Sequence, residues 1–168
     1  MSISSTIIFK IPTVEDGMSI FRLIQRCPPL DTNSSYCNFL QASHFANTSV
    51  AAERDGKLVG FVSGYLVPGK SDTLFIWQVA VDESMRGIGL ASKMLTEILA
   101  RSACKSVQYL ETTITQDNQP SWHLFRRLGK TLLADFTSAV WLEKKNHFDG
   151  QHETEELVRI GPFKTEQV

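Results

Sequence analysis

Cysteine is scarce in this chain, and neither sign of charge is in excess. The three cysteines are an odd number and include no Cys-x-x-Cys pair, which argues against a disulfide framework and against zinc held by thiolates. No apolar run approaches the length that crosses a membrane. The 17 basic and 18 acidic residues leave a net charge of -1, so we expect no basic surface for nucleic acid or for an anionic membrane.

The remaining composition is typical of one globular domain. The chain has 168 residues, of which 42% are apolar and 21% are charged, and both fractions are ordinary for a soluble protein. Its first residues lack the basic and apolar regions of a secretory signal. We therefore predict a single cytoplasmic domain over residues 1–168, with its core in about 6–142 and a polar tail without core periodicity over 143–168.

The spacing of apolar residues predicts the secondary structure. Strand-like alternation between turn residues predicts strands over 6–12, 49–54, 57–67, 74–82, 107–115 and 131–142, the last as one strand or two. Helical spacing with capping residues predicts helices over about 16–27, 34–44, 87–103 and 119–128. An Asp-Gly pair at 55–56 predicts a hairpin. This order predicts a mixed α/β (α+β) fold, with a mostly antiparallel central sheet and helices on both of its faces.

The segment Arg86-Gly87-Ile88-Gly89-Leu90-Ala91 joins a predicted strand to a predicted helix. Its two glycines leave backbone N–H groups unobstructed at the start of the helix, which is a favourable place for a phosphate. The segment lacks the Gly-Lys-Ser/Thr end of a P-loop and the third glycine of a dinucleotide fingerprint. By itself it indicates either a phosphate-binding turn or a tight connection between strand and helix.

Two motifs together make the chain resemble the GCN5-related N-acetyltransferases. The glycine segment matches their Arg/Gln-x-x-Gly-x-Gly/Ala pyrophosphate turn, and Asn118-x-x-Ser121-x-x-x-Phe125-x-x-x-Gly129 lies where the family has a second motif. The predicted order of strands and helices also matches the family along most of the chain. The resemblance implies the GCN5-related N-acetyltransferase fold, acetyl-CoA as co-substrate and no metal.

Four further segments resemble one family within that group, the L-2,4-diaminobutyrate acetyltransferases. These segments are residues 30–36 followed by His44-Phe45, and then 76–81, 111–115 and 152–162, and the match extends over about 6–162. The resemblance implies acetylation of the 4-amino group of L-2,4-diaminobutyrate in the biosynthesis of ectoine, which serves in osmoprotection. It also implies that a tail over 143–162 contributes to the substrate site, and, because homodimers are common in the family, that the protein is a homodimer.

The resemblance places acetyl-CoA mainly on backbone groups. Its pantetheine arm would pair with the backbone of Val79 and Val81 as an added strand does. Amides from Arg86 to Ala91 would hold the pyrophosphate at the positive end of the helix, with the Arg86 side chain and Ser92 beside it. The implied cofactor residues are Val79, Val81, Arg86, Gly87, Ile88, Gly89, Leu90, Ala91, Ser92, Asn118 and Ser121.

A diamino acid has two ammonium groups, so its site needs anions. The resemblance suggests Asp31 first and Glu155 second, and a carboxylate can also act, directly or through water, as the base that leaves the attacking amine neutral. Trp77 would either pack in the core or form a wall of the site, and the Val79 N–H would stabilise the oxyanion during direct transfer in a ternary complex. The other implied substrate residues are Ser34, Tyr36 and His152.

Phe125 departs from the wider family, in which a tyrosine often protonates the departing thiolate. Tyr36 is the preferred substitute, with solvent or an unprotonated thiolate as the alternatives. Asn118 is equally well explained as a helix N-cap, Asp31 can be an ordinary turn residue, and His152 can be a solvated residue of the tail.

Two other functions are also compatible with the sequence. One is a related acetyltransferase that acts on another small amine or on a protein N-terminus. The other is a regulatory module that binds CoA without turnover, and its only support is the missing hydroxyl at Phe125. His147, Asp149, His152 and Glu153 lie close in sequence, but their spacing fits no common metal site.

Overall fold

The computed structural model describes residues 6–165. Contacts divide the chain into two compact units, one made of the residues up to Tyr65 with Trp77–Lys105, the other of Leu66–Ile76 with the residues from Ser106 on. Within the described part, seven strands follow the order β1-β2-β3-β4-β5-β7-β6. One parallel pair among antiparallel ones confirms the predicted mixed sheet. No helix of this part is long and apolar enough to cross a membrane.

The first unit combines an antiparallel meander with helices. Its elements are β1 (Ile8–Lys10), α1 (Gly17–Gln25), α2 (Ser35–Gln41), β2 (Val50–Arg54), most of β3 (Lys57–Leu66), the last part of β4 (Thr73–Val81) and α3 (Leu90–Leu99). Asp55 and Gly56 join β2 to β3, and both have a positive φ (52° and 72°). This is the geometry of a two-residue hairpin turn, so the hairpin predicted from the Asp-Gly pair is confirmed.

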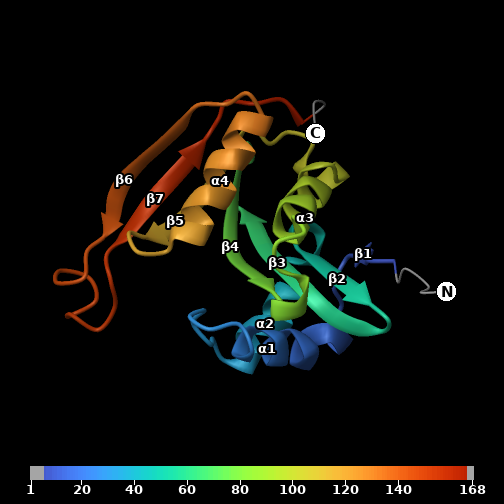
Figure 1. Ribbon diagram of the computed structural model, residues 1–168. Coiled ribbons are helices and arrows are strands. Elements are labelled where there is room, and N and C mark those ends of the chain that lie inside the picture. The colour runs from blue at the N-terminus through green and yellow to red at the C-terminus, as the bar shows by residue number, and fades with distance from the viewer. Residues whose placement is uncertain (1–5, 166–168) are drawn as a thin grey trace. The chain divides into compact units, whose positions relative to one another are not determined.

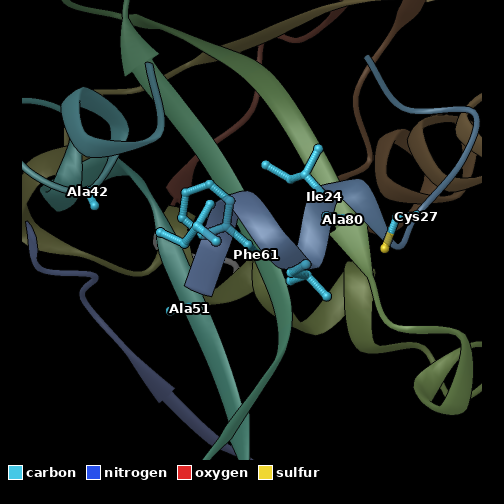
Figure 2. Packing of buried hydrophobic residues seen from close by; sticks show 8 residues of the cluster. Ile24, Cys27, Ala42, Ala51, Phe61 and Ala80 are labelled. Carbon is cyan, nitrogen blue, oxygen red and sulfur yellow. The ribbon is translucent and has the colours of Figure 1, made fainter. Parts of the chain in front are cut away.

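Alternation along β3 allows helices to pack on both faces of the sheet in this unit. Phe61 is fully buried in a cluster with Ile20 and Ile24 of α1 (Figure 2). The preceding residue, Gly60, faces the other way, and a Cβ atom there would lie 2.9 Å from the Cε atom of Met94 in α3. The absence of a side chain at Gly60 therefore lets α3 approach β3 closely, and the prediction of helices on both faces is confirmed here.

The second unit contains the remaining strands and one long helix. Its elements are the first part of β4, β5 (Tyr109–Thr115), α4 (Gln119–Thr131), β6 (Phe136–Leu142) and β7 (Glu155–Ile160). β4 and β5 are parallel, with the register Thr73↔Tyr109. β7 lies between β5 and β6 and pairs antiparallel with both (Figure 1).

β7 corrects the prediction of a polar tail without core periodicity. Val158 and Ile160 are fully buried. They lie two residues apart on the strand, so they face the same side of the sheet, and a Cβ atom at Gly129 of α4 would lie 3.6 Å from the Cγ2 atom of Ile160. The acidic residues at its start and Arg159 obscure the alternation in the sequence, yet Arg159 pairs with Glu111 of β5. Residues 166–168 of the expected tail lie outside the described residues.

The helix boundaries differ from the predicted ones for local reasons. α2 ends at Gln41 rather than near residue 44. α3 begins at Leu90 rather than at residue 87, because Gly87 and Gly89 have φ values of 79° and 76°, which a right-handed helix does not allow. α4 continues to Thr131, so the strand predicted from residue 131 begins later, with β6.

Candidate functional site

The glycine turn at the start of α3 offers free backbone amides. Among the backbone bonds of residues 6–165 outside helices and strands, the Arg86 amide donates to the Glu83 carbonyl (3.3 Å), and none is donated by residues 87–92. The first amides of a helix have no partner inside it. No atom lies within 4 Å of a Cβ built at Gly87 or Gly89. Residues 87–92 can therefore bind an anion, whereas the Arg86 amide, which the resemblance included, is already engaged.

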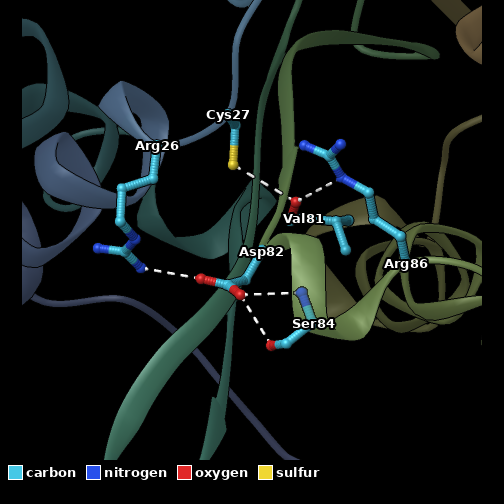
Figure 3. A network of polar contacts seen from close by, with 6 residues as sticks. All are labelled: Arg26, Cys27, Val81, Asp82, Ser84 and Arg86. Atoms are coloured by element: carbon cyan, nitrogen blue, oxygen red, sulfur yellow. Dashed lines mark hydrogen bonds and ion pairs between the residues drawn. The ribbon is translucent and has the colours of Figure 1, made fainter.

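A network of polar contacts supports the end of β4 before this turn (Figure 3). Asp82 accepts hydrogen bonds from the hydroxyl and the amide of Ser84 (2.8 and 3.1 Å) and forms an ion pair with Arg26 (3.2 Å). The bonds from Ser84, and to a smaller extent Arg26, hold the pKa of Asp82 below its usual value. The ionised carboxylate thus stabilises the chain where strand changes to turn.

The carbonyl of Val81 has two donors in this network. The Cys27 Sγ and the Arg86 Nε each lie 3.4 Å from it (Figure 3). Burial raises the pKa of the Cys27 thiol, so this cysteine acts as a protonated donor and not as a nucleophile. The Arg86 side chain therefore lies back against the strand.

The segment before α2 is held at three points. Leu30 packs against the core cluster of α1. The carbonyl of Asp31 accepts a hydrogen bond from the Nε2 of Gln78 on β4 (3.2 Å). The Ser34 hydroxyl accepts one from an amide in the first turn of α2 (3.3 Å), so Ser34 is the N-cap of this helix. Asp31 is exposed, and these three contacts anchor the backbone that carries its side chain.

Tyr36 and Trp77 are both accessible in the first unit. Tyr36 is 71% exposed in the first turn of α2, so its hydroxyl can reach a ligand. Trp77 is 42% exposed and contacts the rings of Phe45 and Tyr65, with centroids 6.4 and 6.2 Å away. This aromatic group could not be predicted from the sequence, because Phe45 lies outside the strands and no spacing relates it to Trp77.

The predicted cofactor residues of the second unit lie at the start of α4. Asn118 accepts a hydrogen bond from the Ser121 amide (3.3 Å), which confirms the interpretation of Asn118 as an N-cap. This role uses the side-chain oxygen and leaves the NH2 group for other contacts. Phe125, at the position of the family's tyrosine, is a buried core residue.

His152 and Glu155 come together at the start of β7. The His152 Nε2 lies 3.8 Å from a carboxylate oxygen of Glu155, and its ring packs on Phe148 at a centroid distance of 4.7 Å. Its other ring nitrogen contacts the Glu153 carbonyl (2.8 Å). His152 is thus a packed residue beside an acid, and not a fully solvated one.

The predicted site residues are therefore divided between the two units. The first unit carries Asp31, Ser34, Tyr36, Trp77, Val79, Val81 and residues 86–92, and the second carries Asn118, Ser121, His152 and Glu155. Within residues 6–165, there is no group of three or more His, Cys, Asp or Glu side chains that could hold a metal ion.

Known proteins resemble this chain in sequence and in structure. A model of the Acetyltransferase (GNAT) family matches residues 18–130. The L-2,4-diaminobutyric acid acetyltransferase of Methylotuvimicrobium alcaliphilum is 56% identical over 156 residues, which cover 93% of this chain and 91% of that protein. The protein of the same name from Chromohalobacter salexigens is 44% identical over 99% of this chain and 87% of its own length.

Solved structures agree with these relatives. The diaminobutyrate acetyltransferase EctA from Paenibacillus lautus, in complex with its substrate L-2,4-diaminobutyric acid and coenzyme A, has a TM-score of 0.91 and 37% identity, covering 95% of this chain and 97% of that chain. Ard1 from Thermoplasma volcanium shares the fold at 17% identity, with a TM-score of 0.74 over 92% of this chain and 97% of that chain. The chain therefore belongs to the acetyltransferase (GNAT) family and, within it, to the L-2,4-diaminobutyric acid acetyltransferases.

Proposed function

We propose that this protein transfers the acetyl group of acetyl-CoA to the 4-amino group of L-2,4-diaminobutyrate and so forms N4-acetyl-L-2,4-diaminobutyrate for ectoine biosynthesis. The observation that carries the proposal is the likeness, over 95% of the chain, to a structure that holds diaminobutyric acid and coenzyme A. The relatives from Methylotuvimicrobium and Chromohalobacter, which bear the corresponding name, add support.

The free amides of residues 87–92 fit the pyrophosphate of the co-substrate, because a helix N-terminus is positive and the glycines leave room. Bound acetyl-CoA supplies an acyl group activated as a thioester. We assign the pantetheine arm to the backbone groups of Val79 and to the amide of Val81, whose carbonyl is engaged by Cys27 and Arg86. Ser92, Asn118 and Ser121 complete the cofactor set.

The reacting amine must lose a proton before it attacks. An amine with a pKa near that of lysine lies about three units above neutral pH, so deprotonation costs roughly 4–5 kcal/mol. Asp31, on its anchored backbone, is our first choice for binding an ammonium group and for accepting the proton, and Glu155 is the second. We assign the Val79 amide to the oxyanion that forms on attack, and we keep Trp77 of the first unit and His152 of the second unit as predicted substrate residues.

Tyr36 is our choice for the residue that protonates the departing thiolate. Phe125 is buried and has no hydroxyl, so it cannot supply the proton. Tyr36 is highly exposed and lies two residues after Ser34, which we also assign to the substrate. Both hydroxyls are carried by the start of α2.

The release of free thiol from acetyl-CoA tests this function. We expect rapid release with L-2,4-diaminobutyrate and slow release with ornithine or lysine, and mass spectrometry should place the acetyl group on N4. Release with the longer diamines alone would indicate a related acetyltransferase. Binding of CoA without release for any amine would indicate a regulatory module, whose only support is the missing hydroxyl at Phe125.

We also propose a cytoplasmic homodimer. Its three cysteines are all free, which suits a reducing compartment. For the dimer, support comes from β6, an edge strand whose residues from Thr137 to Trp141 are all exposed. Exposed edges that carry apolar side chains are typical sites of association.

A further inference from the structure

Gln78 is a buried polar residue of β4 to which the proposed mechanism gives no role. Its side chain is 6% exposed. The Nε2 atom donates to the carbonyl of Asp31, 47 positions away in the chain (3.2 Å). Its Oε1 atom is buried and has no hydrogen-bond partner among the described residues. Gln78 thus makes one long-range contact and leaves one polar atom unsatisfied.

Packing alone does not explain a glutamine at this position. A buried acceptor without a donor reduces stability, and an apolar side chain of similar length would avoid that loss. The feature that an apolar side chain cannot supply is the amide donor. The role of Gln78 must therefore depend on the carbonyl oxygen that accepts this hydrogen bond.

That atom belongs to the backbone of Asp31, the residue we assign to the substrate ammonium. Leu30 fixes one side of the segment by packing on the core, and Ser34 fixes the other as the cap of α2. Gln78 ties the middle of the segment to β4, at the position that follows Trp77 along the strand. Without this tie, the carbonyl of Asp31 would lose its contact with the strand that carries the other substrate groups.

We propose that Gln78 is a positioning residue for the amino-acid substrate. Its amide holds the Asp31 backbone against β4, so that the carboxylate is kept in place relative to Trp77 and to the Val79 amide. This role rests on the proposed function, because it requires Asp31 to bind the diamino acid. It predicts that losing the tie weakens binding of the diamino acid and leaves binding of acetyl-CoA unchanged.

The Gln78→Met variant tests the role, because methionine has nearly the same length and no amide. We expect the KM for diaminobutyrate to rise about fivefold to tenfold, the effect of one hydrogen bond. The KM for acetyl-CoA should stay the same. The midpoint of unfolding should stay the same or rise, because an unsatisfied buried oxygen is removed. A residue that serves stability alone would not give this combination.

Gln41→Met is the matched control. Gln41 is also a fully buried glutamine with one unsatisfied polar atom, but its hydrogen bond is to Asn38 within α2. This variant leaves the Asn38 amide without an acceptor, so it should lose stability and keep the KM for diaminobutyrate. Gln78→Met should thus weaken substrate binding without a loss of stability, whereas Gln41→Met should lose stability without weakening substrate binding.

Hydrogen exchange in the substrate-free protein gives a second readout. Amides of residues 30–36 should exchange faster in Gln78→Met than in the wild type, and should be unaffected in Gln41→Met. An active wild type combined with an unchanged KM and unchanged exchange in Gln78→Met would overturn the role of Gln78 alone. A wild type that leaves diaminobutyrate unacetylated would overturn the proposed function. In that case, unchanged exchange in Gln78→Met would separately show that Gln78 does not hold the Asp31 backbone.

Discussion

At the scale of single residues, the candidate site places exposed side chains on a backbone that is itself held by hydrogen bonds and packing. The Asp31 carboxylate is exposed, yet its own carbonyl is tied to Gln78 and its neighbour Leu30 is packed on the core. An anchored carboxylate loses little conformational freedom when a ligand binds, which favours affinity. This explains how an exposed turn residue can serve as the anchor for an ammonium group.

We expect Asp31→Asn to raise the KM for diaminobutyrate by about 10- to 100-fold, because a charge-assisted hydrogen bond contributes roughly 1.5–3 kcal/mol. The affinity for CoA, measured by calorimetry, should not change. Asp55→Asn is the control, since it removes the same charge from the exposed β2–β3 turn, where asparagine also accepts a positive φ. A loss of CoA binding in Asp31→Asn would contradict the assignment.

Gly89 matters for its conformation and for the space around it. Its φ is 76°, so alanine there should lower the free energy of unfolding by about 1–2 kcal/mol. The added methyl group would also crowd the free amides, and we expect CoA affinity to fall at least about tenfold. Gly69→Ala is the matched control, since φ is 79° in a turn outside the site. Calorimetry and urea unfolding should show equal strain in both variants but a binding defect only in Gly89→Ala.

At the scale of elements, β7 depends on a cross-strand ion pair as well as on apolar burial. Arg159 pairs with Glu111 in register, and its guanidinium lies 3.9 Å from the centroid of the Tyr109 ring. The buried partner of this ion pair is Glu111. The loss of Arg159 would therefore leave a buried carboxylate without a partner, which is more costly than losing a pair at the surface.

We expect Arg159→Met to lower the free energy of unfolding by about 3 kcal/mol, measured with urea at neutral pH. Adding Glu111→Gln should recover part of that loss, because the uncompensated charge is removed. Lys144→Met breaks an ion pair with Glu153 in which both side chains are about half exposed, and should cost less than about 1 kcal/mol. Equal losses in the two single variants would show that burial of Glu111 contributes nothing.

At the scale of the whole molecule, the open edge of β6 bears on oligomeric state. Val140 and Trp141 are exposed on this strand, and among residues 6–165 no further strand lies beside it in the order of the sheet. We expect sedimentation to give twice the mass of the chain, and Val140→Glu or Trp141→Glu to give monomers, because a charge on such an edge disfavours pairing.

Leu133→Glu is the control for the dimer. Leu133 is 86% exposed, but it lies in the connection between α4 and β6 rather than on the edge strand. This variant should keep the mass of the dimer. A wild type that sediments as a monomer at micromolar concentration would contradict the proposal.

The sequence predicted much of the fold and only part of the local roles. The Asp-Gly hairpin, the mixed sheet and the helix that follows the glycine turn depend on neighbouring residues, so they could be inferred from short patterns. β7 was missed because Glu155, Glu156 and Arg159 make half of its six residues charged, so its apolar alternation is too short to stand out from a polar tail. That the whole chain acts as a single domain stays a prediction, as do the roles of the site residues.

The sequence by itself determined the family, the glycine turn and the residue types available to bind a diamino acid, since these depend on motifs that are continuous in the chain. Only the tertiary structure decided that Gln78 holds Asp31, that Val81 accepts from Cys27 and Arg86, and that β7 lies between β5 and β6. The physical reason is that hydrogen bonds and buried ion pairs between distant residues depend on how the elements pack, and no local spacing records that packing.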